Sequence, residues 1–221
     1  MTARVLVIGG SNQGRQTIDA LEIQGDHLVV GVVDGNLPRA SVVVGYPVVG
    51  AADDVRECAE ATRADGFIVA IGDNFARGSL FDAARAACPD LEPVSAIHPS
   101  AVVARDAAVG VGVTILAGAV VSNGCRVGAG ALLGTNSSLD HDGGLGDFVS
   151  LGPGATTGGN VSIGSYTAIG LGANVIHQVT IGSHAVVGAG ALVLKDLPDS
   201  VVAYGVPARV ARRREAAEPY L

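Results

Sequence analysis

When the chain is cut every six residues, residues 145–192 read LGDFVS LGPGAT TGGNVS IGSYTA IGLGAN VIHQVT IGSHAV VGAGAL. The same phase runs without an insertion over residues 97–198. The first position of each six is aliphatic except at Thr157, the second is Gly in ten of seventeen sixes, and the fifth is small or aliphatic throughout. A period of six fits neither an amphipathic helix nor a strand that alternates every two residues. It predicts a coil in which each six supplies one short parallel strand, with its first residue pointing into a narrow core.

Three such strands close one triangular coil of eighteen residues, so residues 97–198 make between five and six coils (102/18). Coils stacked at the parallel-sheet spacing of about 4.8 Å form a prism roughly 27 Å tall. We expect Gly at the second position to relieve backbone strain in the turn. We expect the small residue at the fifth position to allow the three faces to meet around a narrow core. Residues 97–198 are therefore predicted to be an all-β solenoid domain.

The start of the chain carries a different pattern. Residues 4–8 are a short apolar strand, residues 9–14 are a glycine turn that opens a helix, and residues 28–33 are a second strand that ends at Asp34. In nucleotide-binding sheets, N–H groups at such a helix start hold phosphate, and an acid after the second strand accepts hydrogen bonds from ribose hydroxyls. Ser11 stands where a dinucleotide fingerprint needs its middle glycine, which favours a mononucleotide or a nucleotide sugar.

The remainder of this region continues the alternation of strands and helices. A buried strand over residues 66–71 ends in Gly72-Asp73-Asn74, a second polar cluster at the carboxyl end of a strand, where open parallel sheets bind ligands. We predict a nucleotide-binding α/β domain over residues 1–96, followed directly by the solenoid and by a C-terminal turn and tail over residues 199–221. The joint has no Ser/Gly-rich spacer, so the two domains are expected to hold a fixed relation and to share one substrate.

Composition limits the remaining possibilities. The net charge of −7 argues against nucleic acid or an anionic membrane as the main partner. The start MTARVLVIGG lacks the long apolar core of a signal peptide, and no run of eighteen apolar residues exists, so a cytoplasmic location is expected. The three cysteines are odd in number and unpatterned, which favours reduced thiols over a disulfide or metal set.

One histidine on the solenoid stands out. Positions eighteen apart lie above one another, so Gly159 leaves a slot above His141, and His177 lies one coil further on. Asp140 and Asp142 flank His141, in a face otherwise built from Gly, Ala, Ser and Thr. A carboxylate bonded to one ring nitrogen fixes the imidazole tautomer and raises its basicity, as a general base requires. The competing interpretation is a solvated surface histidine on a turn.

The segment GTNSSLDHDGGLGDFVSLGPGATTGGNVSIG (residues 134–164), preceded by IHPSAVV and followed by DLPDSVVAYGVPARV, resembles the bacterial sialic acid O-acetyltransferase family of hexapeptide transferases. It is most similar to the nucleotide-4-amino-sugar N-acetyltransferases, over nearly the whole chain. The resemblance implies a left-handed parallel β-helix after a Rossmann-like domain that binds a UDP- or GDP-linked sugar. It also implies a homotrimer that binds acetyl-CoA between neighbouring prisms, without a metal.

The resemblance also assigns roles by position. It makes His141 the general base and Asp142 the acid that orients it. It places acetyl-CoA against Ser150, Gly159, Leu171, Ala189 and Arg209, and the sugar nucleotide against Gly10, Ser11, Asn12, Asp34, Gly72, Asp73 and Asn74. Two positions depart from the family: many relatives carry a thioester-contacting His at Ser150, and relatives tend to carry Gly-His-Gly where this chain has Asn12-Gln13-Gly14.

We therefore expect an acetyl-CoA-dependent N-acetyltransferase that acts by direct transfer on a UDP- or GDP-linked 4-amino-4,6-dideoxy sugar. Three alternatives remain open. The first is O-acetylation of a sugar, and the second is a silent nucleotide-sugar-binding or scaffold protein. The third is a γ-carbonic-anhydrase-like metal lyase, which also has two histidines 36 residues apart, as His141 and His177 are. That type needs a third histidine five residues on, and His184 falls seven residues on.

Overall fold

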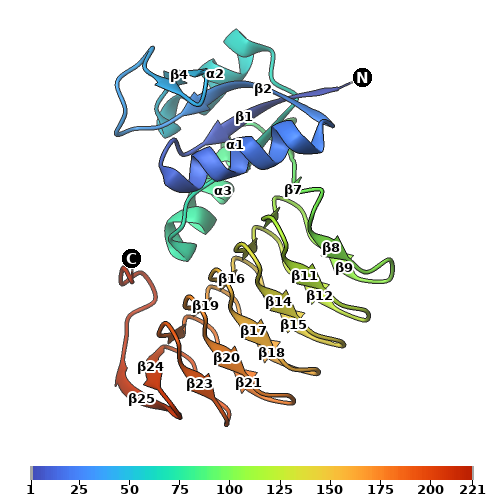
Figure 1. The fold of residues 1–221 in the computed structure, drawn as a ribbon. Helices are drawn as coiled ribbons and strands as arrows, with labels where there is room; N and C mark the ends of the chain where they lie inside the picture. Colours follow the sequence, from blue (N-terminus) through green and yellow to red (C-terminus); the bar gives the residue numbers. More distant parts are fainter. Residues whose placement is uncertain (1, 221) are drawn as a thin grey trace.

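The computed structural model describes residues 2–220 and consists of an α/β domain above a column of stacked short strands (Figure 1). The α/β domain places six strands in one sheet in the order β3-β4-β2-β1-β5-β6, all parallel to their neighbours except β3. Its elements are β1 (Ala3–Ile8), α1 (Asn12–Gln24), β2 (His27–Val33), β3 (Val42–Val43), β4 (Tyr46–Gly50), the 3-10 helix η1 (Ala52–Asp54), α2 (Val55–Thr62), β5 (Gly66–Val69), α3 (Asn74–Ala87) and β6 (Glu92–Pro93).

The sheet is covered on both faces, because β1 carries buried side chains that alternate between them. Val5 and Val7 pack with Ile18 of α1 on one face. Leu6 and Ile8 pack on the other face in a cluster that α2 and α3 complete. Since β2 and β4 lie on one side of β1 while β5 lies on the other, the topology switches direction at the end of β1, where such sheets bind ligands.

The second part is a parallel β-helix built from two-residue strands, which confirms the predicted fold class. We call its three sheets the first, second and third faces. The first face holds β7 (Ala96–Ile97), β10 (Thr114–Ile115), β13 (Leu132–Leu133), β16 (Ser150–Leu151), β19 (Ala168–Ile169) and β22 (Val186–Val187). The second holds β8 (Val102–Val103), β11 (Val120–Val121), β14 (Ser138–Leu139), β17 (Thr156–Thr157), β20 (Asn174–Val175) and β23 (Leu192–Val193). The third holds β9 (Ala108–Val109), β12 (Arg126–Val127), β15 (Gly144–Leu145), β18 (Ser162–Ile163) and β21 (Thr180–Ile181).

The register follows the predicted coil of eighteen residues. Leu133 pairs with Leu151, and Leu151 pairs with Ile169, so that aliphatic first-position side chains stack along the prism axis. From Ile115 onward the first-position side chains are buried, and Thr157 is buried with them. The core is thus a ladder of aliphatic side chains enclosed by three flat faces.

The structure corrects the reason for the second-position glycines. At Gly128, for example, the backbone is ordinary, but a Cβ would lie 2.5 Å from the carbonyl carbon of Gly146 in the next coil. The positive φ angles fall instead at the fourth position, as at Asp142 (58°) and Gly154 (66°). Glycine at the second position therefore permits close stacking of the coils, whereas the turn itself is made two residues later.

The α/β domain is fastened to the corner between the third and first faces by α3. The ring of Phe81 packs edge-on against Phe148 of this corner, with centroids 5.5 Å apart. Phe148 stacks on Tyr166 of the next coil, and Tyr166 stacks on His184 with a centroid distance of 4.9 Å. This aromatic column, directly linked to α3, gives a physical basis for a fixed domain arrangement.

The end of the chain forms more structure than a turn and tail. β24 (Val201–Gly205) pairs in parallel with β22 and extends the first face, and β25 (Ala208–Arg213) pairs antiparallel with β24. Residues 214–220 then return toward α3, so that the C-terminus lies near the α/β domain (Figure 1). We call residues 212–220 the C-terminal strap.

Candidate active site

His141 lies on the corner between the second and third faces, just after β14. Its Nδ1 is 2.9 Å from Oδ2 of Asp142, and both side chains are about half exposed (51% and 57%). Asp142 occupies the fourth position of its six, where an acidic or amide residue tolerates the positive φ. Oδ1 of Asp140 accepts the N–H of His141 at 2.8 Å. The corner thus fixes the ring and leaves Nε2 as the atom available to a substrate.

The electrostatics of this corner favour a base. The hydrogen bond to Asp142 raises the pKa of His141 above its ordinary value of 6.5, and the charge of Asp140 acts in the same direction. Gly159 of the next coil lies over the ring, and a Cβ at that position would meet Nε2 of His141. Within residues 2–220, the N–H of Gly159 has no hydrogen-bond acceptor, so it can serve as a donor beside the imidazole.

The other histidines occupy different places. His177 stands on the same corner as His141, two coils away, because it follows β20 on the second face. His184 follows β21 on the third face and stacks on Tyr166 in the aromatic column. A single chain therefore does not gather His141, His177 and His184. No group of three or more His, Cys, Asp or Glu side chains suited to a metal ion occurs within residues 2–220.

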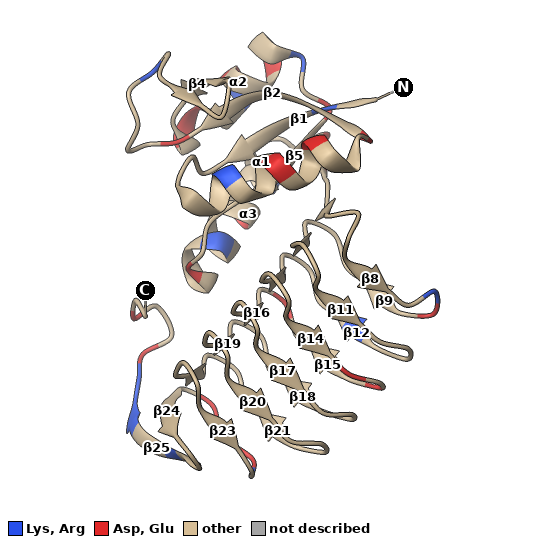
Figure 2. Cartoon of the chain, viewed as in Figure 1, with Lys and Arg blue, Asp and Glu red and all other residues tan. Residues whose placement is uncertain are grey.

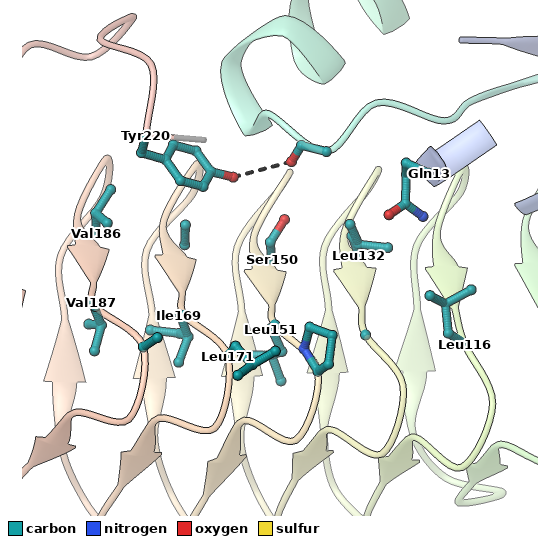
Figure 3. Close-up of a pocket in the computed structure, with 18 of the residues that line it drawn as sticks. Gln13, Leu116, Leu132, Ser150, Leu151, Ile169, Leu171, Val186, Val187 and Tyr220 are labelled. Carbon is teal, nitrogen blue, oxygen red and sulfur yellow. Dashed lines mark hydrogen bonds between the residues drawn. The ribbon is translucent and has the colours of Figure 1, made fainter. Parts of the chain in front are cut away.

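A cavity of about 400 Å³ lies against the first face, beneath the α/β domain (Figure 3). It contains three of the residues predicted to contact acetyl-CoA, namely Ser150, Leu171 and Ala189, and one predicted to contact the sugar nucleotide, Gly72. Sequence reasoning missed the rest of its lining, which includes Gln13, Gln16, Leu116, Leu132, Val186 and Tyr220. A sequence signal for the aliphatic wall was present. The last residue of each six that precedes a first-face core position points outward, and it is small or apolar at Leu132, Ala168 and Val186.

His141 is not among the residues that line this cavity. Leu171 and Ala189 follow strands of the first face, whereas His141 and Gly159 follow strands of the second face. The predicted base and the predicted acyl-donor groove therefore lie on different corners of one prism. One chain alone does not bring them together.

Ser150 is buried at the domain joint, where it forms part of the cavity lining. Its hydroxyl donates to Oδ1 of Asn74 at 2.5 Å and accepts from Nη2 of Arg77 at 3.0 Å. Arg77 is 3% exposed and also donates to the carbonyls of Gly130 and Phe148, so one guanidinium bonds both domains. Burial lowers the pKa of Arg77 to about 10, which still leaves it protonated at neutral pH.

Two residues that the sequence predicts at the sugar-nucleotide site form hydrogen bonds within the protein that stabilise the fold. Asp73 caps α3, since its Oδ1 accepts the N–H of Ala76 at 2.9 Å. Asn74 is 1% exposed and donates to the carbonyl of Thr167 at 3.0 Å. A capping acid and a ligand-binding acid at the end of a strand have the same sequence signature, so the pattern could not separate them.

The glycine turn after β1 forms a second, shallower hollow. Gly10, Ser11 and Asn12 line it as predicted, together with Arg15, Leu37, Pro38, Ser41, Val42 and Val43. Asp34 braces the turn, because its Oδ2 accepts the N–H of Gly10 at 2.7 Å and its Oδ1 accepts that of Asn36 at 2.8 Å. The strands that end before Asp34 and before Asp73 are not adjacent, since β1 lies between β2 and β5. Arg15, a cation on the first turns of α1, was missed.

The last predicted cofactor residue, Arg209, lies exposed on β25. Figure 2 shows basic residues, all of them Arg, gathered along β25 and the segment after it, while most of the solenoid strands carry no charge. No helix within residues 2–220 is long and apolar enough to cross a membrane.

Comparison with known proteins relates this arrangement to a family. Residues 4–84 match the family model of the PglD N-terminal domain. A histidine-to-asparagine variant of perosamine N-acetyltransferase from Caulobacter crescentus, solved in complex with CoA and GDP-perosamine, is 38% identical to this chain with a TM-score of 0.90. The match covers 96% of this chain and 98% of that chain.

Two further solved structures are similar over the same extent. The acetyltransferase domain of PglB from Neisseria gonorrhoeae, in complex with acetyl coenzyme A, is 31% identical, with a TM-score of 0.88 and coverage of 95% and 100%. WeeI from Acinetobacter baumannii is 25% identical, with a TM-score of 0.84 and coverage of 93% and 98%. A comparison with curated proteins gave no match. The chain belongs to the nucleotide-amino-sugar acetyltransferases of the hexapeptide family.

Proposed function

We propose that this protein transfers the acetyl group of acetyl-CoA to the amino group of a nucleotide-linked amino sugar, with His141 as the general base. The observation that carries the proposal is the 2.9 Å hydrogen bond between Nδ1 of His141 and Asp142, which leaves Nε2 free on an open corner. The Caulobacter relative, solved with CoA and GDP-perosamine, supports the substrate class. A UDP- or GDP-linked 4-amino-4,6-dideoxy sugar is the specific acceptor that we infer.

The proposed reaction is direct acyl transfer. The neutral amine attacks the thioester carbonyl carbon, a nitrogen–carbon bond forms, and Nε2 of His141 takes a proton from the amine. The tetrahedral oxyanion accepts a hydrogen bond from a backbone donor, for which the N–H of Gly159 is suitably free. Collapse breaks the carbon–sulfur bond, and the leaving sulfur takes the proton back from His141. Holding the two substrates in contact contributes roughly 7–11 kcal/mol in well-aligned cases.

The site is proposed to form between two copies of the chain in a homotrimer. The base corner of one chain and the cavity of its neighbour must meet, because they lie on different corners of each prism. In cyclic symmetry, such a contact between two unlike surfaces closes into three equivalent sites. The acyl arm of acetyl-CoA would occupy the cavity beside Ser150, Leu171 and Ala189, with Arg209 toward the CoA phosphates.

The sugar nucleotide is assigned to the α/β domain. The N–H of Gly10 is bonded to Asp34, but the turn offers the backbone N–H groups of Ser11 and Asn12 at the start of α1, and Arg15 adds a cation that suits a diphosphate. Asp34 holds this turn in shape. A cytoplasmic location is part of the proposal, since Cys58, Cys88 and Cys125 are all free thiols, as a reducing compartment permits.

A thiol-release assay tests the proposal. Purified protein and acetyl-CoA are mixed with UDP-, GDP- and dTDP-linked 4-amino sugars, and free CoA is measured together with the mass of the product. We expect release with at least one amino sugar and a product that resists hydroxylamine, because an amide survives where an ester is cleaved. Release with a hydroxylamine-sensitive product would instead establish O-acetylation. No release with any of these acceptors would contradict the proposed activity.

A further inference from the structure

The C-terminal strap holds a tyrosine over one end of the cavity. Arg212 binds Glu218 through two hydrogen bonds of 2.6 and 3.1 Å. Arg214 is buried and donates to the carbonyls of His184 and Glu218, and its guanidinium lies 5.9 Å from the centroid of the Tyr220 ring. These contacts fix the strap on the solenoid corner and direct Tyr220 toward the domain joint (Figure 3).

The hydroxyl of Tyr220 contacts two acceptors at the joint. It donates to Oδ1 of Asn74 at 2.8 Å and lies 3.2 Å from the carbonyl oxygen of Gly72. Both acceptors already have other donors. Oδ1 of Asn74 accepts from Nη2 of Arg77 at 2.9 Å and from Ser150 at 2.5 Å, and the carbonyl of Gly72 accepts from Nη1 of Arg77 at 3.0 Å.

This arrangement makes the Tyr220 hydroxyl redundant for the joint. Without Tyr220, the Ser150 hydroxyl still gives Oδ1 of Asn74 a donor, and Nη1 of Arg77 still gives the carbonyl of Gly72 one. If Tyr220 turned its hydroxyl to another acceptor, no buried oxygen would be left without a donor, so the exchange would avoid the usual cost of an unsatisfied group. Burial raises the pKa of Tyr220, which keeps the hydroxyl protonated and able to donate at neutral pH.

We propose that Tyr220 is a ligand-contacting residue of the cavity, whose hydroxyl leaves the joint to donate a hydrogen bond to a carbonyl oxygen of the bound acyl-CoA arm. This inference rests on the proposed function, because it assigns the cavity to the acyl donor. The lining favours that assignment: apart from Gln13, Gln16 and Ser150, its walls are mainly aliphatic side chains and the bare backbone of Gly152, Gly170 and Gly188. A chain of methylene groups with a few carbonyl oxygens suits such walls, and needs few donors.

The first test compares two tyrosine-to-phenylalanine variants of the full chain. Tyr220→Phe keeps the ring and removes only the hydroxyl, and Tyr46→Phe is a matched control that removes a hydroxyl bonded to Glu22 at 2.7 Å, away from the cavity. We expect Tyr220→Phe to raise the KM for acetyl-CoA roughly 3- to 10-fold, the value of one hydrogen bond. The KM for the nucleotide sugar and the melting temperature should stay unchanged, and Tyr46→Phe should alter neither KM.

The second test observes the contact between Tyr220 and acetyl-CoA in the protein of unchanged sequence. The chain has four tyrosines, so labelling with 3-fluorotyrosine should give four fluorine resonances, with that of Tyr220 assigned from Tyr220→Phe. Saturation with acetyl-CoA should shift the Tyr220 resonance and leave that of Tyr46 in place.

The outcomes separate this inference from the proposed function. Acetyl-CoA that binds with an unmoved Tyr220 resonance, and an unchanged KM in Tyr220→Phe, would overturn the inference alone. A rise confined to the KM of the nucleotide sugar, or a lower melting temperature with both KM values intact, would also overturn it. If acetyl-CoA failed to bind the wild-type protein, the proposed function would fall and this inference with it.

Discussion

At the scale of single residues, the chemistry depends on how His141 and Asp142 are joined. Adjacent side chains point apart in a regular strand, but Asp142 has a φ of 58°, which turns its carboxylate back toward the neighbouring ring. With Nδ1–H bonded to Asp142, the lone pair of the imidazole resides on Nε2, facing solvent and Gly159. The local turn therefore selects the tautomer that a base needs.

Removal of the imidazole should abolish most of the rate. We expect His141→Ala to lower kcat by roughly 10²- to 10⁴-fold, the usual contribution of a positioned base. Binding of acetyl-CoA should persist, because the cavity is built by other residues. Initial rates at saturating substrates measure the effect, and His98→Ala, which removes an imidazole bonded to Ser100 just after β7, serves as the control. A wild-type kcat in His141→Ala would contradict a role as base, and only the positioning of the two substrates would then explain the rate.

The pH dependence should report the same pair. His141 acts as a base only when neutral, and its pKa is raised above 6.5 by the hydrogen bond to Asp142, so kcat should rise with pH through an apparent pKa above 6.5. Asp142→Asn removes that negative acceptor, so the rising limb should move to lower pH while the plateau rate falls. Profiles of kcat for both proteins decide the matter. A limb that stays in place in Asp142→Asn would assign it to the substrate amine.

At the scale of structural elements, the solenoid depends on how closely its coils approach. A Cβ at Gly128 would stand 2.5 Å from the carbonyl carbon of Gly146, in backbone that cannot move without separating two coils. At Gly154 the φ is 66°, yet nothing lies within 4 Å of where a Cβ would be. The two glycines are therefore required for different physical reasons.

This difference predicts unequal costs for the same substitution. Gly154→Ala should lose about 1 kcal/mol of stability, from strain in the left-handed region alone. Gly128→Ala should lose roughly 2–3 kcal/mol, because the coils must shift to admit the methyl group. Thermal or denaturant unfolding of both variants measures the difference in their free energies of unfolding. Equal destabilisation would mean that coil stacking does not constrain the second position.

The solenoid could be predicted from sequence because its pattern of aliphatic and glycine positions repeats every six residues. The elements β1, α1 and β2 could be predicted because each has its own local pattern of apolar residues. Contacts between distant parts of the chain leave no such period. Tyr220 reaches Asn74 across 146 positions, and Ser150 reaches it across 76. Asp73 and Asn74 are predicted at a ligand site because they follow a strand, but their contacts in a helix cap and at the domain joint have no local sequence signal of their own. The contact between His141 and Asp142 was predictable because the two residues are adjacent in the sequence.

At the scale of the whole molecule, the proposed base and the proposed acyl-donor cavity are separated on each prism. His141 stands between the second and third faces, and the cavity lies against the first face under the α/β domain. The central claim is that catalysis joins the His141 corner of one chain to the cavity of the next in a trimer. Light scattering should therefore give three times the mass of one chain.

Mixing two inactive variants tests this claim most directly. His141→Ala removes the base and keeps the cavity, whereas Ala189→Trp fills the cavity from an exposed position and keeps the base. Each variant alone should be nearly inactive. After co-expression with two different tags and random assembly, about one quarter of the sites combine an intact corner with an intact neighbouring cavity. We predict that the randomly assembled population recovers about one quarter of the wild-type kcat, and that mixed trimers purified through both tags recover about one third, because each of them holds one intact site of three. Mixed trimers no more active than either parent would contradict a site shared between chains.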